Sequence, residues 1–271
     1  MIGQTDIVSW IYAHNIDNSP KITMFLGETG SGKHELSKLI SEHLKLDIID
    51  ISENINSDTI NEIYSNPIPK IYLINLDNLN EKQQNTILKF IEEPIDSSFV
   101  ILVSSNANMI LETIENRCYK IKLKAYSKDE LSQFIKDNKY KDFLLNICMA
   151  PGQIISLQDS NCNLNDLYSL CNKVVNDIDK ATLSNALSII NNLNITNVYD
   201  KYDLKTFMKT IEYIVMQNID KLNFNLLFIT YNITEKYLNR LNDNRLNTTS
   251  LMTNYIIELW EERQKLNRGK Y

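Results

Sequence analysis

The sequence predicts an α/β domain with a parallel sheet, followed by a chain that is helical to its end. Over residues 1–123, short apolar runs alternate with amphipathic patterns, which is typical of parallel strands joined by helices. From residue 164 onward, amphipathic patterns follow one another with scarcely any glycine or proline, which favours a helical bundle. We therefore expect three domains: an α/β domain at 1–123, a small helical lid at 124–163 and a helical domain at 164–271.

Apolar runs of strand length define the predicted sheet. Buried parallel strands need near-continuous apolar runs, because helices cover both faces of such a sheet. The runs are KITMFLG (21–27), LDIIDI (46–51), KIYLINL (70–76), FVILVSS (99–105) and KIKLK (120–124). Between them we expect helices over HELSKLISEHL (34–44) and NEKQQNTILKFIEE (80–93), and a short helix just before Arg117.

Helices are expected throughout the rest of the chain. Ser127 is followed by Glu130 three residues later, a capping box that predicts a helix over 127–138. The next helix, 141–150, should stop at Pro151-Gly152, where another begins. Further amphipathic helices are expected over residues 164–178, 182–193, 203–219, 224–241 and 250–266.

Composition narrows the class of protein. The hydrophobic fraction of 43% is ample for a packed core. No apolar stretch reaches the roughly 18 residues of a membrane-spanning helix, and MIGQTDIVSW lacks the features of a signal peptide. The four cysteines show neither CxxC pairs nor metal-ligand spacing, so we expect reduced thiols in a cytosolic protein without a metal: Cys118, Cys148, Cys162 and Cys171.

The charge distribution argues against autonomous binding to nucleic acid. Residues 1–165 carry 15 Lys and Arg against 22 Asp and Glu, and residues 166–271 carry 13 against 12. Such binding depends on a basic face that neutralises phosphates, and the chain offers none.

A phosphate-binding motif lies between the first predicted strand and the helix that follows it. GETGSGKH (27–34) fits G-x-x-x-x-G-K in the structural context that this motif requires. Gly27, Gly30 and Gly32 permit backbone angles that point successive N–H groups at phosphate oxygens. Lys33 would contact the terminal phosphates, and the helix N-terminus adds positive potential.

Two defects argue that this motif does not support hydrolysis. His34 takes the place of the Ser or Thr whose hydroxyl ligates Mg²⁺, and imidazole is a poor ligand for that ion. After the third strand, Asn75 or Asp77 occupies the position of the metal-binding acid, and no Glu follows either of them to activate water. Two interpretations stay open: the loop still binds a nucleotide, or it only joins strand to helix. We expect no required cofactor.

Arg117, in the segment ENRC, has two interpretations as well. It could be an arginine finger offered to the nucleotide of an adjacent subunit, where it would stabilise the transferring phosphoryl group. It could equally pair with an acid such as Glu115 or cap a helix C-terminus. The spacing alone favours the structural role.

Four motifs together resemble a known family. GETGSGK (27–33), QNTILKFIEEP (84–94), SSN (104–106) and TIENRC (113–118) are similar to the phosphate loop, the QNALLKTLEEP segment, the sensor-1 segment and the T-I-x-S-R-C motif of bacterial clamp-loader subunits. These subunits are members of the AAA+ superfamily, and the resemblance covers about residues 1–160. It implies that Ser105 and Asn106 lie in the sensor-1 segment and that Arg117 is the trans-acting arginine.

Within that family the chain looks most like the delta-prime subunits of DNA polymerase III, which keep this arginine while their own ATP site is degenerate. It departs from them in lacking a zinc-binding cysteine module, and it carries Gln153 where active members have the sensor-2 arginine. The resemblance implies a AAA+ fold with a helical lid and a C-terminal collar domain that assembles subunits.

The resemblance also implies a function: a non-hydrolysing part of the clamp loader within the polymerase holoenzyme, not catalytic on its own. Its partners would be the tau/gamma and delta subunits and the sliding clamp, with primer-template DNA bound only in the complex and no membrane. The alternatives are an active tau/gamma-like ATPase, another P-loop ATPase or kinase, and a DNA-binding replication regulator.

Overall fold

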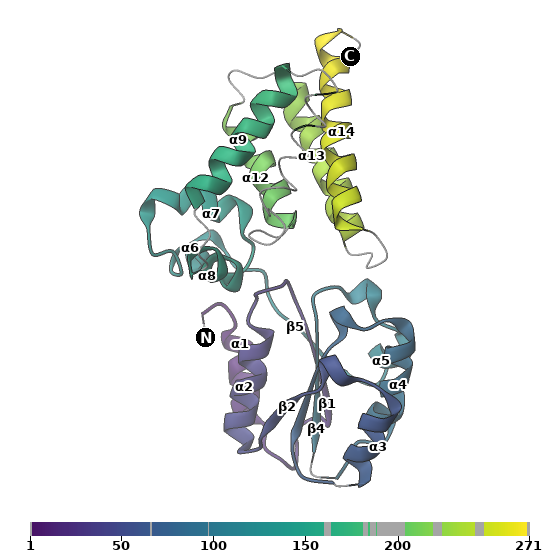
Figure 1. Ribbon diagram of the computed structural model, residues 1–271. Helices are drawn as coiled ribbons and strands as arrows, with labels where there is room; N and C mark the ends of the chain where they lie inside the picture. The colour runs from purple at the N-terminus through teal and green to yellow at the C-terminus, as the bar shows by residue number, and fades with distance from the viewer. Residues whose placement is uncertain are drawn as a thin grey trace. The chain divides into compact units, whose positions relative to one another are not determined.

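The computed structural model (Figure 1) describes residues 2–65, 67–96, 98–159, 164–180, 184, 188, 204–218, 224–241 and 247–269. The chain splits into two compact units. The first comprises Met1–Phe134 and Met149–Gln153, and the second comprises Ile135–Cys148 and Ile154–Tyr271. The three-domain division with boundaries at residues 123 and 163 stays a prediction.

The first unit contains a five-stranded parallel sheet. Its strands occur where the sequence predicts them, each shorter by one to three residues: β1 Ile22–Leu26, β2 Ile48–Asp50, β3 Ile71–Asn75, β4 Phe99–Ser104 and β5 Tyr119–Lys122. The spatial order is β2-β3-β4-β1-β5, and every neighbouring pair is parallel. The predicted parallel α/β fold is therefore confirmed.

Helices cover both faces of this sheet. Two lie on one face, α1 Thr5–Ala13 and α2 Lys33–Leu44, and three on the other, α3 Ser57–Ser65, α4 Glu81–Glu92 and α5 Glu112–Glu115 (Figure 1). Side chains of each strand alternate between two cores: Phe25 of β1 packs with α1 and α2, whereas its neighbour Met24 packs with α4. Both are fully buried, so the strands need apolar residues at successive positions.

The capping box at Ser127 is confirmed, but the helix that follows it is shorter than predicted. Ser127 and Glu130 make both reciprocal hydrogen bonds of the motif. Helix α6 then spans only Lys128–Ser132, and not the whole of 127–138. Further along, the backbone N–H of Lys136 donates to a side-chain oxygen of Gln158 at 2.7 Å, so it is not available for a helical bond.

The second unit is built from helices. Among its described residues these are α7 Lys141–Ile147, the later part of α8 Pro151–Asp159, α9 Leu164–Lys180, α12 Leu204–Gln217, α13 Phe224–Leu241 and α14 Thr248–Asn267. Short 3-10 turns occur in both units: η1 Ser52–Asn54, η2 Leu76–Asn78, η3 Ala107–Met109 and η4 Asn138–Tyr140. Helix α12 packs against α7, α9 and α13, and α14 packs against α13 and α9. The predicted helix at 182–193 lies outside the described residues.

The described part of the chain contains neither a membrane-spanning helix nor a metal site. None of its helices is long and apolar enough to cross a membrane. No group of three His, Cys, Asp or Glu side chains comes together there as a metal site. Cys148 and Cys171 are buried free thiols, and Cys162 lies outside the described residues.

A buried hydrogen bond joins α13 and α14 within the second unit. The hydroxyls of Thr234 and Tyr255 lie 3.0 Å apart, and both side chains are fully buried. Burial raises the pKa of Tyr255 well above its ordinary value, and the Thr234 hydroxyl opposes this effect. The pair satisfies two polar groups that would otherwise be costly to bury.

Thr234→Val should therefore lower the free energy of unfolding by about 1–3 kcal/mol, because the buried Tyr255 hydroxyl loses its partner. In the double variant Thr234→Val/Tyr255→Phe no orphaned hydroxyl remains, so its cost should fall below the sum of the two single costs. Equilibrium urea unfolding of the four proteins measures this coupling. Strictly additive costs would contradict the pairing.

Candidate functional site

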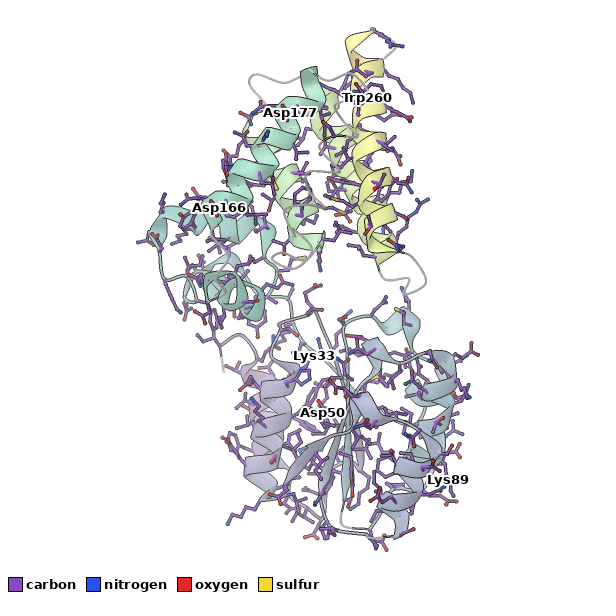
Figure 2. All side chains as sticks on the ribbon, in the orientation of Figure 1. Lys33, Asp50, Lys89, Asp166, Asp177 and Trp260 are labelled. Atoms are coloured by element: carbon purple, nitrogen blue, oxygen red, sulfur yellow. The ribbon has the colours of Figure 1, made fainter. Side chains whose placement is uncertain are left out.

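The predicted site residues meet at the carboxyl ends of the parallel strands, the end at which such sheets bind ligands. The phosphate loop, residues 27–32, follows β1, Asp77 follows β3, and Ser105 follows β4. The N–H of Gly27 donates to the carbonyl oxygen of Ser104 at 3.1 Å, which joins the first and last of these strands. Figure 2 shows Lys33 at this end of the sheet.

Glycine is required in the loop for two different reasons. Gly30 and Gly32 have φ of 81° and 97°, left-handed values that strain any residue with a side chain. Gly27 is needed for space, since a Cβ atom there would lie 2.9 Å from the Cβ of Leu123. The loop thus has the conformation that the motif predicts.

Lys33 is turned back onto its own loop. Its side chain is only 6% exposed, and its Nζ donates to the carbonyl oxygens of Gly27 at 2.6 Å and Glu28 at 3.0 Å. Burial lowers the pKa of Lys33, whereas the carboxylates of Asp77 and Glu28 act in the opposite direction. The ammonium group that would contact phosphate is therefore satisfied by groups of this chain.

The first turn of α8 closes onto the same loop. The N–H of Gly152 donates to the carbonyl of Gly30 at 2.9 Å, and a Cβ atom on Gly152 would lie 2.7 Å from the Gly30 Cα. Gln153 donates through Nε2 to the carbonyl of Thr29 at 3.0 Å. Its Oε1 accepts from the N–H of Met149 at 2.8 Å, which fixes the orientation of the amide.

Tyr126 completes this set of bonds. Its hydroxyl donates to the carbonyl of Ser31 at 2.8 Å, and burial raises the pKa of the phenol. Each carbonyl from residue 27 to residue 31 thus accepts a hydrogen bond from this chain's own donors. Among the described residues, the buried hydroxyl of Ser31 has no hydrogen-bond partner.

The structure distinguishes between the two candidates for the acidic position. Asp77 accepts from the hydroxyl of Ser104 at 2.6 Å and from the N–H of Ser105 at 2.8 Å, and its charge, like that of Glu28, acts on Lys33. The Asn75 side chain instead accepts from the N–H of Asp77 and caps the turn η2.

Asn106 does not contribute its side chain to this arrangement. Its amide oxygen accepts from the N–H of Asn108 at 3.1 Å and caps η3. Within the sensor-1 segment, Ser104 bonds Asp77 through its hydroxyl and Ser105 does so through its backbone N–H. Gly152 and Tyr126 were not among the predicted site residues. The Pro151-Gly152 pair was a signal for Gly152, and the sequence carries none for Tyr126.

These residues do not fit a magnesium–nucleotide group poised for hydrolysis. Mg²⁺ needs oxygen ligands in near-octahedral geometry. His34, at the position of the metal-binding hydroxyl, supplies only imidazole nitrogens and is exposed at the start of α2. Asp77 is the acid that follows β3, but its carboxylate already accepts hydrogen bonds from Ser104 and Ser105. The residue after Asp77 is Asn78, and its amide cannot act as a base for water.

Arg117 lies away from this loop. Tyr119, two residues later, pairs with Thr23 at the start of β1, whereas the phosphate loop follows the end of β1. The guanidinium is 41% exposed and forms an ion pair with Glu92 at 2.8 Å. It also donates to the carbonyl of Thr113 at 2.7 Å.

Arg117 pairs with an acid, as its structural interpretation allowed, but that acid is Glu92 and not Glu115. Glu115 pairs with Lys120 at 3.2 Å, and Arg117 takes an acid from α4 in its place. The capping role that the sequence allowed is observed, because Thr113 belongs to α5. Next to it, the thiol of Cys118 donates to the carbonyl of Ile114, and burial raises its pKa to about 12. At neutral pH this cysteine is a protonated thiol and no nucleophile.

Sequence comparisons match part of the chain. Residues 43–127 match the family model of the DNA polymerase III delta subunit. The chain is 30% identical over 77 residues to DNA polymerase III subunit delta' of Buchnera aphidicola subsp. Schizaphis graminum, covering 28% of this chain and 24% of that protein. It is 30% identical over 111 residues to subunit gamma of Buchnera aphidicola subsp. Acyrthosiphon pisum, covering 37% and 31%. The matches thus span less than a third of either relative.

Solved structures share the fold. A DNA polymerase III gamma subunit-related protein of Thermotoga maritima superposes with a TM-score of 0.55 at 14% identity, covering 95% of this chain and 99% of that one. The RuvB Holliday junction branch migration motor of Thermotoga maritima gives 0.51 at 18% identity, covering 83% and 80%. The expected AAA+ fold is confirmed.

Gly152→Ala should separate the first turn of α8 from the phosphate loop. The added Cβ atom would meet backbone atoms of Gly30, which cannot move aside as a side chain would, so we expect a loss of about 1–3 kcal/mol in unfolding free energy. Ser156→Ala, at an exposed position of the same helix, is the matched control and should stay within about 0.5 kcal/mol of wild type. Urea unfolding tests both, and equal stability of the two variants would contradict the contact.

Proposed function

We propose that this clamp-loader family member of the AAA+ class is a non-hydrolysing subunit of the DNA polymerase III clamp loader. In this proposal it offers Arg117 to the nucleotide of an adjacent ATPase subunit. Its partners would be the tau/gamma and delta subunits and the sliding clamp, with primer-template DNA bound in the assembled complex. The protein would act in the cytosol and need no nucleotide to fold.

The state of the phosphate loop carries this proposal. Lys33 is hydrogen-bonded to carbonyls of its own loop, and Gly152 and Gln153 bond the same loop from outside. His34 stands where a hydrolysing site needs a hydroxyl, and no Glu follows Asp77 to activate water. Together these features support a subunit that keeps the AAA+ fold without using its own site.

The location of Arg117 supports a role in trans. Its side chain is partly exposed and lies near the end of the sheet opposite the chain's own loop. A guanidinium in that position can reach a neighbouring molecule without competing with the home site. Arginine suits this task because its planar fork can contact two phosphate oxygens.

A second candidate is an active gamma-like ATPase. The longer of the two sequence matches, over 111 residues, is to a subunit gamma, and this observation favours it. It requires that His34 and Asp77 suffice for metal and water chemistry. A DNA-binding regulator is less well supported, because the acidic first part of the chain lacks the basic surface that such binding uses.

The purified chain should show no Mg²⁺-dependent ATP turnover in a steady-state phosphate-release assay. The reason is the missing hydroxyl at position 34 and the missing base beside Asp77. Lys33→Ala is the control, since it removes the lysine of the loop and should leave the background rate unchanged. Turnover of about 1 s⁻¹, an ordinary enzymatic rate, that disappears in Lys33→Ala would establish the gamma-like alternative.

Arg117→Ala should slow the DNA-stimulated ATPase of the reconstituted complex while leaving the fold intact. An arginine finger in trans is worth about 10³-fold or more at its own site, and other sites in the assembly dilute this share. The stability of the isolated chain should change by less than about 1 kcal/mol, because the ion pair with Glu92 is exposed.

Two further variants sharpen this test. Arg117→Lys should not restore the rate, since one ammonium cannot reproduce the guanidinium fork. Lys120→Ala removes a neighbouring exposed cation with its own ion pair, and should leave the rate at the wild-type value. If Arg117→Ala supports the wild-type rate, Arg117 is a structural residue and the proposed role in trans fails.

A further inference from the structure

Two residues of α4, Gln84 and Glu92, hold the segment that carries Arg117. They lie eight positions apart, a little over two helical turns, and so project from similar sides of the helix. Both make side-chain contacts with residues between 109 and 117, which lead from η3 through α5. One helix thus fixes the segment at two points.

Gln84 fixes the start of the segment. Its Nε2 donates to the carbonyl of Met109 at 2.9 Å, and its Oε1 accepts from the N–H of Leu111 at 3.0 Å. The side chain is 3% exposed, so these are buried backbone bonds with a defined geometry. Ile114 of α5 is fully buried in the same core as α4, which anchors the short helix beneath the arginine.

Glu92 fixes the arginine itself. One terminal nitrogen of Arg117, Nη2, pairs with Glu92 Oε1 at 2.8 Å, and the other, Nη1, donates to the carbonyl of Thr113 at 2.7 Å. The guanidinium is therefore held from two elements, α4 and α5. The nearby charges Glu115 and Lys120 pair with each other, so Glu92 is the acid that acts on the arginine.

The value of this pair is in orientation and not in stability. Both side chains are more than two-fifths exposed, and an exposed ion pair of this kind contributes little to stability. A guanidinium has five N–H donors, and the two contacts use one on each terminal nitrogen. Donors thus remain for phosphate oxygens while Glu92 and Thr113 keep the group in place.

We propose that Glu92 is a positioning residue for Arg117, with Gln84 holding the backbone that presents both. This inference rests on the proposed function, since it concerns the reaction at a neighbouring subunit's nucleotide. Pre-orientation matters there because a misplacement of about 1 Å can cost on the order of 100-fold in rate. A free arginine side chain would have to lose rotamer entropy on engaging the phosphate.

The test measures DNA-stimulated ATPase of the reconstituted complex with Glu92→Ala, Glu92→Gln and the control Glu115→Ala. Glu92→Ala should lower kcat on the order of 10-fold and leave the KM for ATP within about 2-fold, because it misorients the finger and not the substrate. Glu92→Gln, which keeps an acceptor oxygen, should retain more of the rate. Glu115→Ala removes an acid from the same segment and should leave kcat unchanged.

Arg117→Ala separates this inference from the proposed function. If it slows the complex and Glu92→Ala does not, the positioning role is wrong and the function in trans stands. If neither variant slows it, both fail. A rise in kcat with Glu92→Ala would show that Glu92 holds the arginine back, which also overturns the inference. Combining Glu92→Ala with Arg117→Ala should add no further loss, because the two residues act through one group.

Discussion

The hydrogen bonds on the carbonyl groups of the phosphate loop are the constraint on which the first unit depends. A loop with left-handed glycines at 30 and 32 turns its N–H groups to one side and its carbonyls to the other. In this chain Lys33, Tyr126 and the first turn of α8 supply the donors for carbonyls 27 to 31. The loop therefore keeps its shape through contacts of the chain itself.

The parallel sheet separates the phosphate loop from Arg117 in space. Its carboxyl end carries the loop, Asp77 and Ser105, and the loop's bonds there tie α8 to the sheet. Arg117 lies just before β5, near the amino end of the sheet. Strands of one direction place these features at opposite ends. In the proposed function, this separation lets the chain offer Arg117 to a neighbour without using its own site.

The sequence predicted the strands of the sheet well and the contacts between distant segments poorly. The central strands β1, β3 and β4 were predictable because burial on both faces leaves runs with few polar residues. The edge strands β2 and β5 were also predicted, although they are less buried. Helices α1 and α3 were not predicted; each is only nine residues long. Arg117 pairs with Glu92, which is 25 positions away, and Gly152 meets Gly30 across more than a hundred residues. Such pairings are set by tertiary packing, which spacing along the chain does not contain.

The chain itself completes its phosphate loop through the hydrogen bonds on the loop carbonyls. Amide hydrogen exchange of Gly152 and Ser31, whose N–H groups donate to the carbonyls of Gly30 and Glu28, tests it most directly. Both amides should exchange slowly in the chain without nucleotide, and adding ATP with Mg²⁺ should not change their rates. Fast exchange without nucleotide, followed by protection of the loop when ATP is added, would contradict the account.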